Sequence, residues 1–197
     1  MTTRLVVGLS GSSGSIYGIR LLEALRRMPD IESHLILTGP AKRTLVEETE
    51  YSVHAVEALA SRVYDNRDIG AALASGSYRT GGMVILPCSI RTACALAVGT
   101  GDGLLCRAAD VTLKEGRPLI VGVRETPLHL GHLRQLAGLA ELGAIIFPPV
   151  PAFYLRPKTV EDLVNQTVGR ILDRLGLPNP WTAEWTGTRP PGRGDGD

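Results

Sequence analysis

Five short apolar segments, spaced along the chain, constrain its fold more than any other feature. They are rich in Val, Ile and Leu, hold almost no polar residue, and are bounded by Gly or Pro. Strands that helices cover on both faces have this composition, as in a parallel sheet. The five predicted strands are residues 5–9, 35–37, 83–86, 119–123 and 144–147.

Segments with the period of a helix lie between or after these strands. Residues 16–28 place apolar side chains three apart, residues 131–142 place Leu and Ala on one face, and residues 159–175 carry the longest apolar stripe. Thr159 and Asp162 have the spacing of a capping box at the start of that last helix. Strand and helix therefore alternate, which predicts the α/β class with a doubly wound parallel sheet.

The length of 197 residues is that of one domain, with room for a short appendage. Gly176 and Pro178 end the last predicted helix, and beyond them the composition shifts to Trp, Gly, Pro and Arg. We therefore predict a single domain over residues 1–178 and a partly flexible C-terminal extension over residues 179–197.

Charge and cysteine content exclude several classes of protein. The 21 basic and 20 acidic residues give a net charge of +1, so no overall field attracts nucleic acid or an anionic membrane. The longest uncharged stretch, residues 142–155, falls short of the about 20 apolar residues that a membrane-spanning helix needs. Three cysteines, Cys88, Cys94 and Cys106, show no metal-ligand spacing, which favours a reduced, cytoplasmic protein without a metal.

Glycines and serines crowd the loop after the first strand, residues 8–18. Small residues at the start of a helix let backbone N–H groups and hydroxyls converge on a phosphate. Ser10 stands where the dinucleotide fingerprint needs its first Gly, and no acidic residue follows Thr38 at the end of the second strand. The loop therefore favours a mononucleotide phosphate, although an ordinary Gly/Ser turn is an equally good interpretation of this loop alone.

A second loop of the same type, residues 87–92, follows the strand at 83–86. Ser89 and Thr92 supply hydroxyls at another helix start, with Arg91 beside them. The carboxyl ends of parallel strands lie at one edge of the sheet, where ligands bind. Two such loops at one edge strengthen the prediction of a phosphate-bearing ligand.

Several motifs, taken together, resemble the UbiX-type flavin prenyltransferases. The resemblance covers roughly residues 3–177, in order and without large gaps. The motifs are GSSGSIYGIRLLE at 11–23, PCSIRT at 87–92, RAADVTLKE at 107–115, RETPL at 124–128 and PPVPAFY at 148–154.

This resemblance implies a cytoplasmic enzyme with a flavodoxin-like Rossmann fold, a three-layer sandwich, assembled as a dodecamer. Such enzymes join the dimethylallyl group of dimethylallyl phosphate to N5 and C6 of reduced FMN. The product, prenylated FMN, is the cofactor of UbiD-type decarboxylases, and no metal is needed. Members of the family have themselves been described as decarboxylases.

The resemblance also assigns roles by position in the motifs. The implied catalytic residues are Ser13, Glu48 and Glu125. The implied FMN contacts are Gly11, Ser12, Ser13, Thr38, Ser89, Ile90, Arg91, Thr92 and Arg124. The implied contacts to the phosphate of the prenyl donor are Arg107, Lys114, Tyr154 and Arg170. Many relatives have Ser-Lys where this chain has Gly39-Pro40, which weakens the prediction of a phosphate contact there.

Structural interpretations stand beside several of these roles. If residues 107–115 are helical, Arg107 and Lys114 share a face on which they pair with Asp110 and Glu115. Glu48 lies in an acidic run typical of a solvated surface.

Histidine and cysteine side chains offer weaker alternatives. His129 and His132 are three apart but lack a third metal ligand, and no His is positioned to activate Cys88 as a nucleophile.

Two other functions remain open on the sequence. A flavin-dependent decarboxylase of peptidyl-cysteine or phosphopantothenoylcysteine shares the implied fold, but the sequence PCSIRT differs from the PASANT of that class at the second loop. A non-catalytic FMN carrier, or a partner subunit of a decarboxylase, needs only the flavin loops. Lys114, Glu125, Tyr154 and Arg170 weigh against that alternative, because flavin storage needs none of them.

Overall fold

One parallel sheet organises the chain, and the computed structural model describes residues 2–181. Its strands lie in the order β3-β2-β1-β4-β5-β6, and every neighbouring pair is parallel. This arrangement confirms the predicted doubly wound α/β fold. The six strands are β1 (Thr3–Leu9), β2 (Ile31–Leu37), β3 (Arg62–Asp65), β4 (Gly82–Cys88), β5 (Leu119–Val123) and β6 (Ile145–Ile146).

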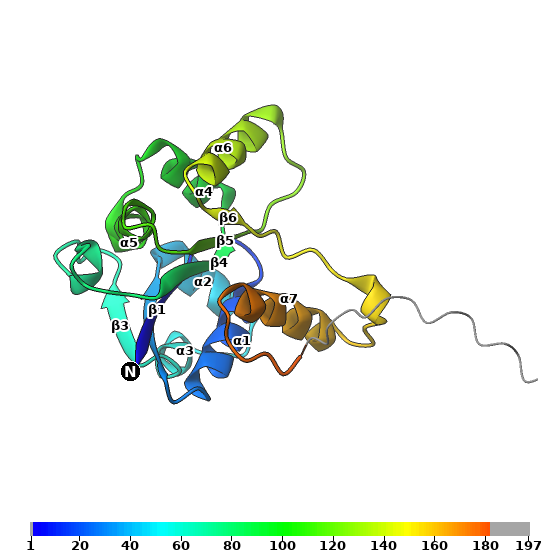
Figure 1. Cartoon of the computed structure of the whole chain (residues 1–197). Helices are drawn as coiled ribbons and strands as arrows, with labels where there is room; N and C mark the ends of the chain where they lie inside the picture. Colours follow the sequence, from blue (N-terminus) through cyan, green and yellow to red (C-terminus); the bar gives the residue numbers. More distant parts are fainter. Residues whose placement is uncertain (1, 182–197) are drawn as a thin grey trace, which may run out of the picture.

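Helices cover both faces of the sheet and make a three-layer sandwich (Figure 1). The first face packs against α1 (Ser15–Arg26), α2 (Gly39–Glu48), α3 (Val53–Glu57) and α7 (Val160–Arg174). The second face packs against α4 (Ile90–Val98), α5 (Gly103–Lys114) and α6 (Leu130–Glu141). Two short 3₁₀ turns, η1 (Ala72–Ala74) and η2 (Phe153–Leu155), lie in the connections.

The side chains of β1 show why the strand sequences are apolar without alternation. Leu5, Val7 and Leu9 pack into the core with α1 and α7, while Val6 packs into the opposite core with α5. Successive side chains of a strand point to opposite faces, and here both faces are buried. A strand of this kind has no polar side to expose.

The boundaries differ from the predicted ones where local chemistry decides them. The strand β3 is missing from the prediction because Arg62–Asp65 is a polar sheet edge, largely exposed. The helix α1 ends at Arg26, two residues before its predicted end, because Pro29 disfavours helical backbone at Met28. The strand β2 begins four residues before its predicted start, and β6 spans only two of the four predicted residues.

The capping box predicted for the last helix is confirmed. The Thr159 hydroxyl accepts the Asp162 N–H at 3.1 Å, and the Asp162 carboxylate accepts the Thr159 N–H at 2.9 Å. The predicted C-terminal extension falls outside the described residues from position 182 onward, so the predicted division into domains stays a prediction.

The segment between β6 and α7, residues 147–159, stands out from the body and is called the arm below (Figure 1). Phe153 on the arm is 71% exposed, and Val150 and Tyr154 are exposed as well. Apolar side chains held this far from a core commonly mark a contact with another protein surface. None of the helices between residues 2 and 181 combines the length and the apolar character that crossing a membrane requires.

Candidate active site

The strand order reverses between β1 and β4, and the loops after these two strands meet at the carboxyl edge of the sheet. Ser10 joins them: its N–H donates to the Pro87 carbonyl at 3.0 Å, and its hydroxyl accepts the Ser89 N–H at 2.7 Å. Ser10 is only 2% exposed. An open α/β sheet binds its ligands at such a reversal point, so this edge is the candidate site.

The neighbouring strand ends are attached to the same edge by backbone hydrogen bonds. The Thr38 N–H donates to the Leu9 carbonyl at 3.1 Å, and the Arg124 N–H donates to the Cys88 carbonyl at 3.0 Å. These bonds fix where the loops after β2 and β5 begin. Four of the predicted site segments therefore come together: residues 11–13, Thr38, residues 89–92 and Arg124.

The first loop needs glycine for a close approach. A Cβ on Gly11 would lie 2.3 Å from the Pro40 Cβ, far inside van der Waals contact. Gly14, at φ +102°, turns the backbone into α1. Between them, the buried Ser12 hydroxyl has no hydrogen-bond partner among residues 2–181. A buried polar atom without a partner indicates a site built for a ligand.

The Glu48 carboxylate binds the start of α1. Its Oε2 accepts the Gly14 N–H at 2.8 Å and the Ser15 N–H at 3.2 Å, and the Ser13 hydroxyl also donates to it. Burial raises the pKa of Glu48, but these hydrogen bonds and the charge of Arg124 outweigh it, so the pKa lies below its usual range. Glu48 is thus a charged carboxylate at neutral pH.

This contact changes how the first loop serves a phosphate. A phosphate is predicted at the start of the helix that follows this loop, and the Gly14 and Ser15 N–H groups there donate to Glu48. A carboxylate at a helix N-terminus uses the same N–H groups and the same positive end of the helix dipole. The phosphate contact expected at this loop therefore has a competitor within the chain.

The second loop keeps its helix start open. The Ser89 hydroxyl caps α4 by accepting the Thr92 N–H at 3.2 Å, and the Ser89 and Thr92 hydroxyls lie 2.9 Å apart. Ile90 and Arg91 are the first residues of α4, so their N–H groups have no acceptor inside the helix. Two open N–H groups, two hydroxyls and the exposed Arg91 make this loop the better phosphate site of the two.

Thr38 and Arg124 flank the crevice. The Thr38 hydroxyl caps α2 by accepting the Ala41 N–H at 3.2 Å, and Pro40 lies in the first turn, where its missing N–H costs nothing. Arg124 is exposed at the end of β5 and lies within electrostatic reach of Glu48. Glu125, next along the chain, is exposed at the same edge.

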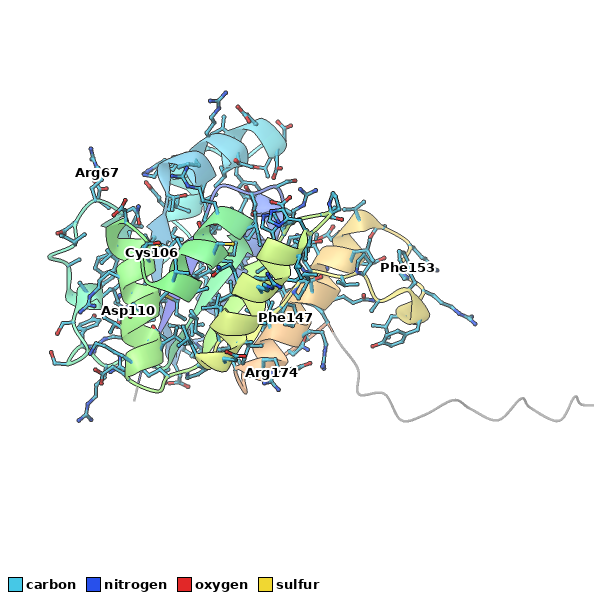
Figure 2. All side chains as sticks on the ribbon, turned by 90° about the horizontal axis from the view of Figure 1, so that it is seen from above. Arg67, Cys106, Asp110, Phe147, Phe153 and Arg174 are labelled. Atoms are coloured by element: carbon cyan, nitrogen blue, oxygen red, sulfur yellow. The ribbon has the colours of Figure 1, made fainter. Side chains whose placement is uncertain are left out.

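The four predicted contacts to the prenyl donor do not come together within one chain. Tyr154 lies on the arm and Arg170 lies on α7, where it pairs with Asp173 at 3.0 Å. Arg107 and Lys114 lie on α5, and they make the pairs anticipated from the sequence, each at 2.6 Å. Figure 2 shows Asp110, the partner of Arg107, on the opposite side of the molecule from Phe153 on the arm.

The position of Lys114 follows from the direction of α5. This helix begins beside Asn66, just beyond the carboxyl end of β3, and ends shortly before β5 begins. Lys114, its last residue, therefore lies toward the amino edge of the sheet, away from the loops at residues 11–13 and 89–92. It lines a groove of 640 Å³ between α4 and α5, together with Arg107, Cys106 and Val98.

Histidine and cysteine side chains fill structural roles near this edge. His129 Nδ1 caps α6 by accepting the His132 N–H at 3.3 Å. Within residues 2–181, no three His, Cys, Asp or Glu side chains are grouped to hold a metal ion. Burial raises the pKa of the Cys88 thiol to about 12, so Cys88 is a protonated core residue and not a nucleophile.

Three residues at this edge, Ser10, Tyr17 and Thr167, have no predicted role in the site. Ser10 breaks the dinucleotide fingerprint in the sequence, and in the structure it connects both loops. Tyr17 lies one turn into α1 and interacts with Arg124 and with Thr167 of α7. The pairing of Tyr17 with Thr167 has no signal in the sequence, because 150 positions separate the two residues.

Comparison with known proteins decides the family. Residues 1–172 match the family described as Flavoprotein. The flavin prenyltransferase UbiX of Escherichia coli (strain K12) is 56% identical over 186 residues, which cover 93% of this chain and 98% of that protein. The chain belongs to the UbiX-type flavin prenyltransferases. This confirms the resemblance recognised in the five sequence motifs.

Solved structures of flavin prenyltransferases share the fold closely. The crystal structure of AnUbiX (PadA1) in complex with FMN and dimethylallyl pyrophosphate has a TM-score of 0.93 at 43% identity, covering 96% of this chain and all of that one. A dodecameric FMN-dependent UbiX-like decarboxylase from Escherichia coli O157:H7 has a TM-score of 0.92 at 45% identity, covering 94% and 100%. The flavodoxin-like fold is therefore confirmed.

Proposed function

We propose that this chain joins the dimethylallyl group of dimethylallyl phosphate to N5 and C6 of reduced FMN, and so makes prenylated FMN for a UbiD-type decarboxylase. The observation that carries the proposal is the grouping of Ser13, Glu48 and Arg124 beside two hydroxyl-bearing loops at the sheet reversal. A proton-relaying carboxylate and a cation at one flavin site suit alkylation of the flavin. Storage of the flavin alone needs neither.

The residues present fit a bound FMN. The open start of α4, with Ser89 and Thr92, suits the FMN phosphate. The Ser12 hydroxyl, which has no partner among the described residues, and Arg124 suit the polar atoms of the flavin ring. When bound, reduced FMN supplies the nucleophilic N5 and C6 atoms and an aromatic face for the allyl group.

Glu48 and Ser13 are the proposed proton carriers. Joining the allyl group to N5 and C6 would break its C–O bond to the phosphate and displace one proton from each position. One of these protons would be returned to the alkene carbon of the prenyl group as the ring closes, and the other would be taken up by the released phosphate. The Ser13 hydroxyl donates to a Glu48 carboxylate that is charged at neutral pH. A charged carboxylate hydrogen-bonded to a hydroxyl passes a proton along that bond. Glu125, at the same edge, is the second proposed carboxylate.

The departing phosphate needs cations and a hydrogen-bond donor around it. We assign the cations to Arg107, Lys114 and Arg170 and the donor to the Tyr154 hydroxyl. Within one chain these residues lie on three separate elements, α5, the arm and α7. The exposed Phe153 of the arm and the groove between α4 and α5 suit a contact between copies. We therefore propose a homo-dodecamer in which Arg107 and Lys114 of one copy complete the site of a neighbouring copy.

A reducing, cytoplasmic setting fits the cysteines. Cys88, Cys94 and Cys106 are all free. Free thiols are typical of compartments in which glutathione keeps cysteine reduced. We place the proposed activity there.

The deciding assay supplies the purified protein, under anaerobic conditions, with reduced FMN and dimethylallyl phosphate or dimethylallyl pyrophosphate. We expect a flavin product heavier by one C5 unit in mass spectrometry. Bound FMN without that product, with either donor, would favour the carrier alternative over the transferase.

Mixing of two impaired variants tests the shared site. Glu48→Gln and Lys114→Ala chains, mixed through reversible dissociation, form assemblies in which some sites receive a native Glu48 from one copy and a native Lys114 from another. We expect partial recovery of activity on mixing, above the reduced activity that each variant shows alone. Activity that stays absent in verified mixed assemblies contradicts the shared site and leaves the reaction itself to the assay above.

A further inference from the structure

Ser10 lies between the two loops of the candidate site and contacts both of them. Its N–H donates to the Pro87 carbonyl at 3.0 Å, which extends the pairing of β1 with β4 past Gly8. Its carbonyl accepts the Ser12 N–H at 2.8 Å, and its hydroxyl accepts the Ser89 N–H at 2.7 Å. One buried residue therefore holds positions in both loops.

These contacts divide between the backbone and the side chain of Ser10. The backbone N–H and carbonyl bind Pro87 and Ser12, whereas the side-chain hydroxyl makes the contact to Ser89. The hydroxyl proton faces the Pro87 carbonyl at 3.5 Å, which leaves the lone pairs of the oxygen for the Ser89 N–H. Loss of the hydroxyl therefore releases Ser89 and leaves the backbone contacts of the first loop in place.

The Ser10 hydroxyl acts on the start of α4 through Ser89. Ser89 is the N-cap of this helix, and its own hydroxyl accepts the Thr92 N–H at 3.2 Å. The N–H groups of Ile90 and Arg91 come directly after it and have no acceptor inside the helix. The directions of these open N–H groups depend on where the Ser89 backbone lies, and the Ser10 hydroxyl holds that backbone.

Ser12 is the polar group that faces a ligand in the first loop. Its hydroxyl is buried without a hydrogen-bond partner among residues 2–181, which suits a polar atom of the flavin ring. The ribityl chain joins the ring of FMN to its phosphate, so a bound FMN meets Ser12 and the start of α4 at the same time. The separation of these two groups decides how well both ends of FMN fit.

We propose that Ser10 is a positioning residue of the flavin site: its hydroxyl fixes the start of α4 relative to Ser12, and so gives the site its preference for FMN over riboflavin, the same flavin without the phosphate. The inference rests on the proposed placement of the FMN phosphate at the start of α4. A group that is fixed before binding loses less freedom when the ligand arrives, which favours the ligand that uses it. Ser10 is buried and acts on the flavin through Ser89.

The test compares two ligands on the native chain and its variants. The full chain, freed of flavin, is titrated with FMN and with riboflavin, and flavin fluorescence gives the Kd of each. Ser10→Ala deletes the hydroxyl and keeps the backbone contacts. Ser33→Ala is the matched control, because Ser33 is equally buried and its hydroxyl accepts the N–H of the distant Ser61 at 3.1 Å, near the amino end of β2.

We expect Ser10→Ala to weaken FMN binding about fivefold, the range for one hydrogen bond, and to leave riboflavin binding unchanged. The preference for FMN over riboflavin therefore falls by the same factor. Ser33→Ala keeps the native affinity for both flavins, because its hydrogen bond lies away from the site.

An equal loss of FMN and riboflavin affinity in Ser10→Ala marks a merely structural effect and overturns the proposal. An unchanged preference for FMN in this variant, or a native chain that binds both flavins equally, overturns it as well. If Ser10→Ala does not fold, Ser10→Cys takes its place, since sulfur is a weak acceptor, and a native preference for FMN in that variant overturns the proposal. The measurement needs no turnover, so a failure of the proposed prenyl transfer remains distinguishable from a failure of this inference.

Discussion

Replacing Glu48 by Gln separates the two tasks of this residue, the capping of α1 and the transfer of a proton. The amide oxygen of Gln still accepts from Gly14 and Ser15, but the negative charge is lost. Charge-assisted hydrogen bonds contribute about 1.5–3 kcal/mol where they are sheltered. Because Glu48 is an exposed residue, solvent screening reduces the expected cost to about 1 kcal/mol.

A loss of this size leaves the protein folded. For a chain of this length it lowers Tm by about 2–4 °C. With a free energy of unfolding of about 5–15 kcal/mol, well over 99% of the molecules stay native at 25 °C. A fall in turnover at 25 °C therefore cannot come from unfolding.

We expect Glu48→Gln to bind FMN as the native chain does and to turn over at least about tenfold more slowly, as for a lost acid–base group. The assay is single-turnover formation of prenylated flavin, with thermal unfolding measured in parallel. Glu47→Gln is the control, since Glu47 is exposed and, among residues 2–181, pairs only with Arg43 on the same helix. Native turnover in Glu48→Gln would refute the proton-transfer role and leave Glu48 as a helix cap.

Three further predictions follow from packing, capping and titration. Gly11→Ala places a Cβ 2.3 Å from the Pro40 Cβ, and we expect this overpacking to weaken FMN binding about tenfold in equilibrium dialysis. Gly138→Ala, which adds its Cβ in open space, leaves FMN binding unchanged in the same assay. Thr159→Ala removes the capping box of α7 and lowers the free energy of unfolding by about 1 kcal/mol in urea titrations. Burial lowers the pKa of His34 and outweighs the Glu32 carboxylate, which raises it. The folded chain therefore binds fewer protons than the unfolded chain below about pH 6.5. Stability therefore falls as the pH drops from there toward the folded-state pKa, and the urea midpoint of a His34→Gln variant changes less between pH 7.5 and pH 5.5.

The sequence predicts most strands and helices because these depend on local chemistry. Buried parallel strands need apolar side chains on both faces. The start of α7 is predicted by the capping box of Thr159 and Asp162. The sequence does not predict the edge strand β3, because β3 is largely exposed to solvent and its polar sequence resembles that of a loop. The family motifs are likewise continuous stretches of sequence, so they identify the family without a structure.

The assembly of the site depended on contacts between distant segments. In the sequence, Glu48 is part of an acidic run typical of a solvated surface. In the structure, its carboxylate accepts the N–H groups of Gly14 and Ser15. Ser10 connects two loops that are 77 positions apart, and the contact of Tyr17 with Thr167 crosses from α1 to α7. No local pattern encodes such pairs, because they form only where the sheet order places two strand ends side by side.

The sequence by itself determined the element types, the parallel sheet and the family, since these follow from periodicity, capping and continuous motifs. Only the tertiary structure decided which helix start is open to a phosphate. Glu48, at the end of α2, binds the start of α1, whereas no carboxylate contacts the start of α4 among residues 2–181. It also decided that Lys114 and Tyr154 lie far apart in one chain, since helix direction and sheet order fix those positions in three dimensions.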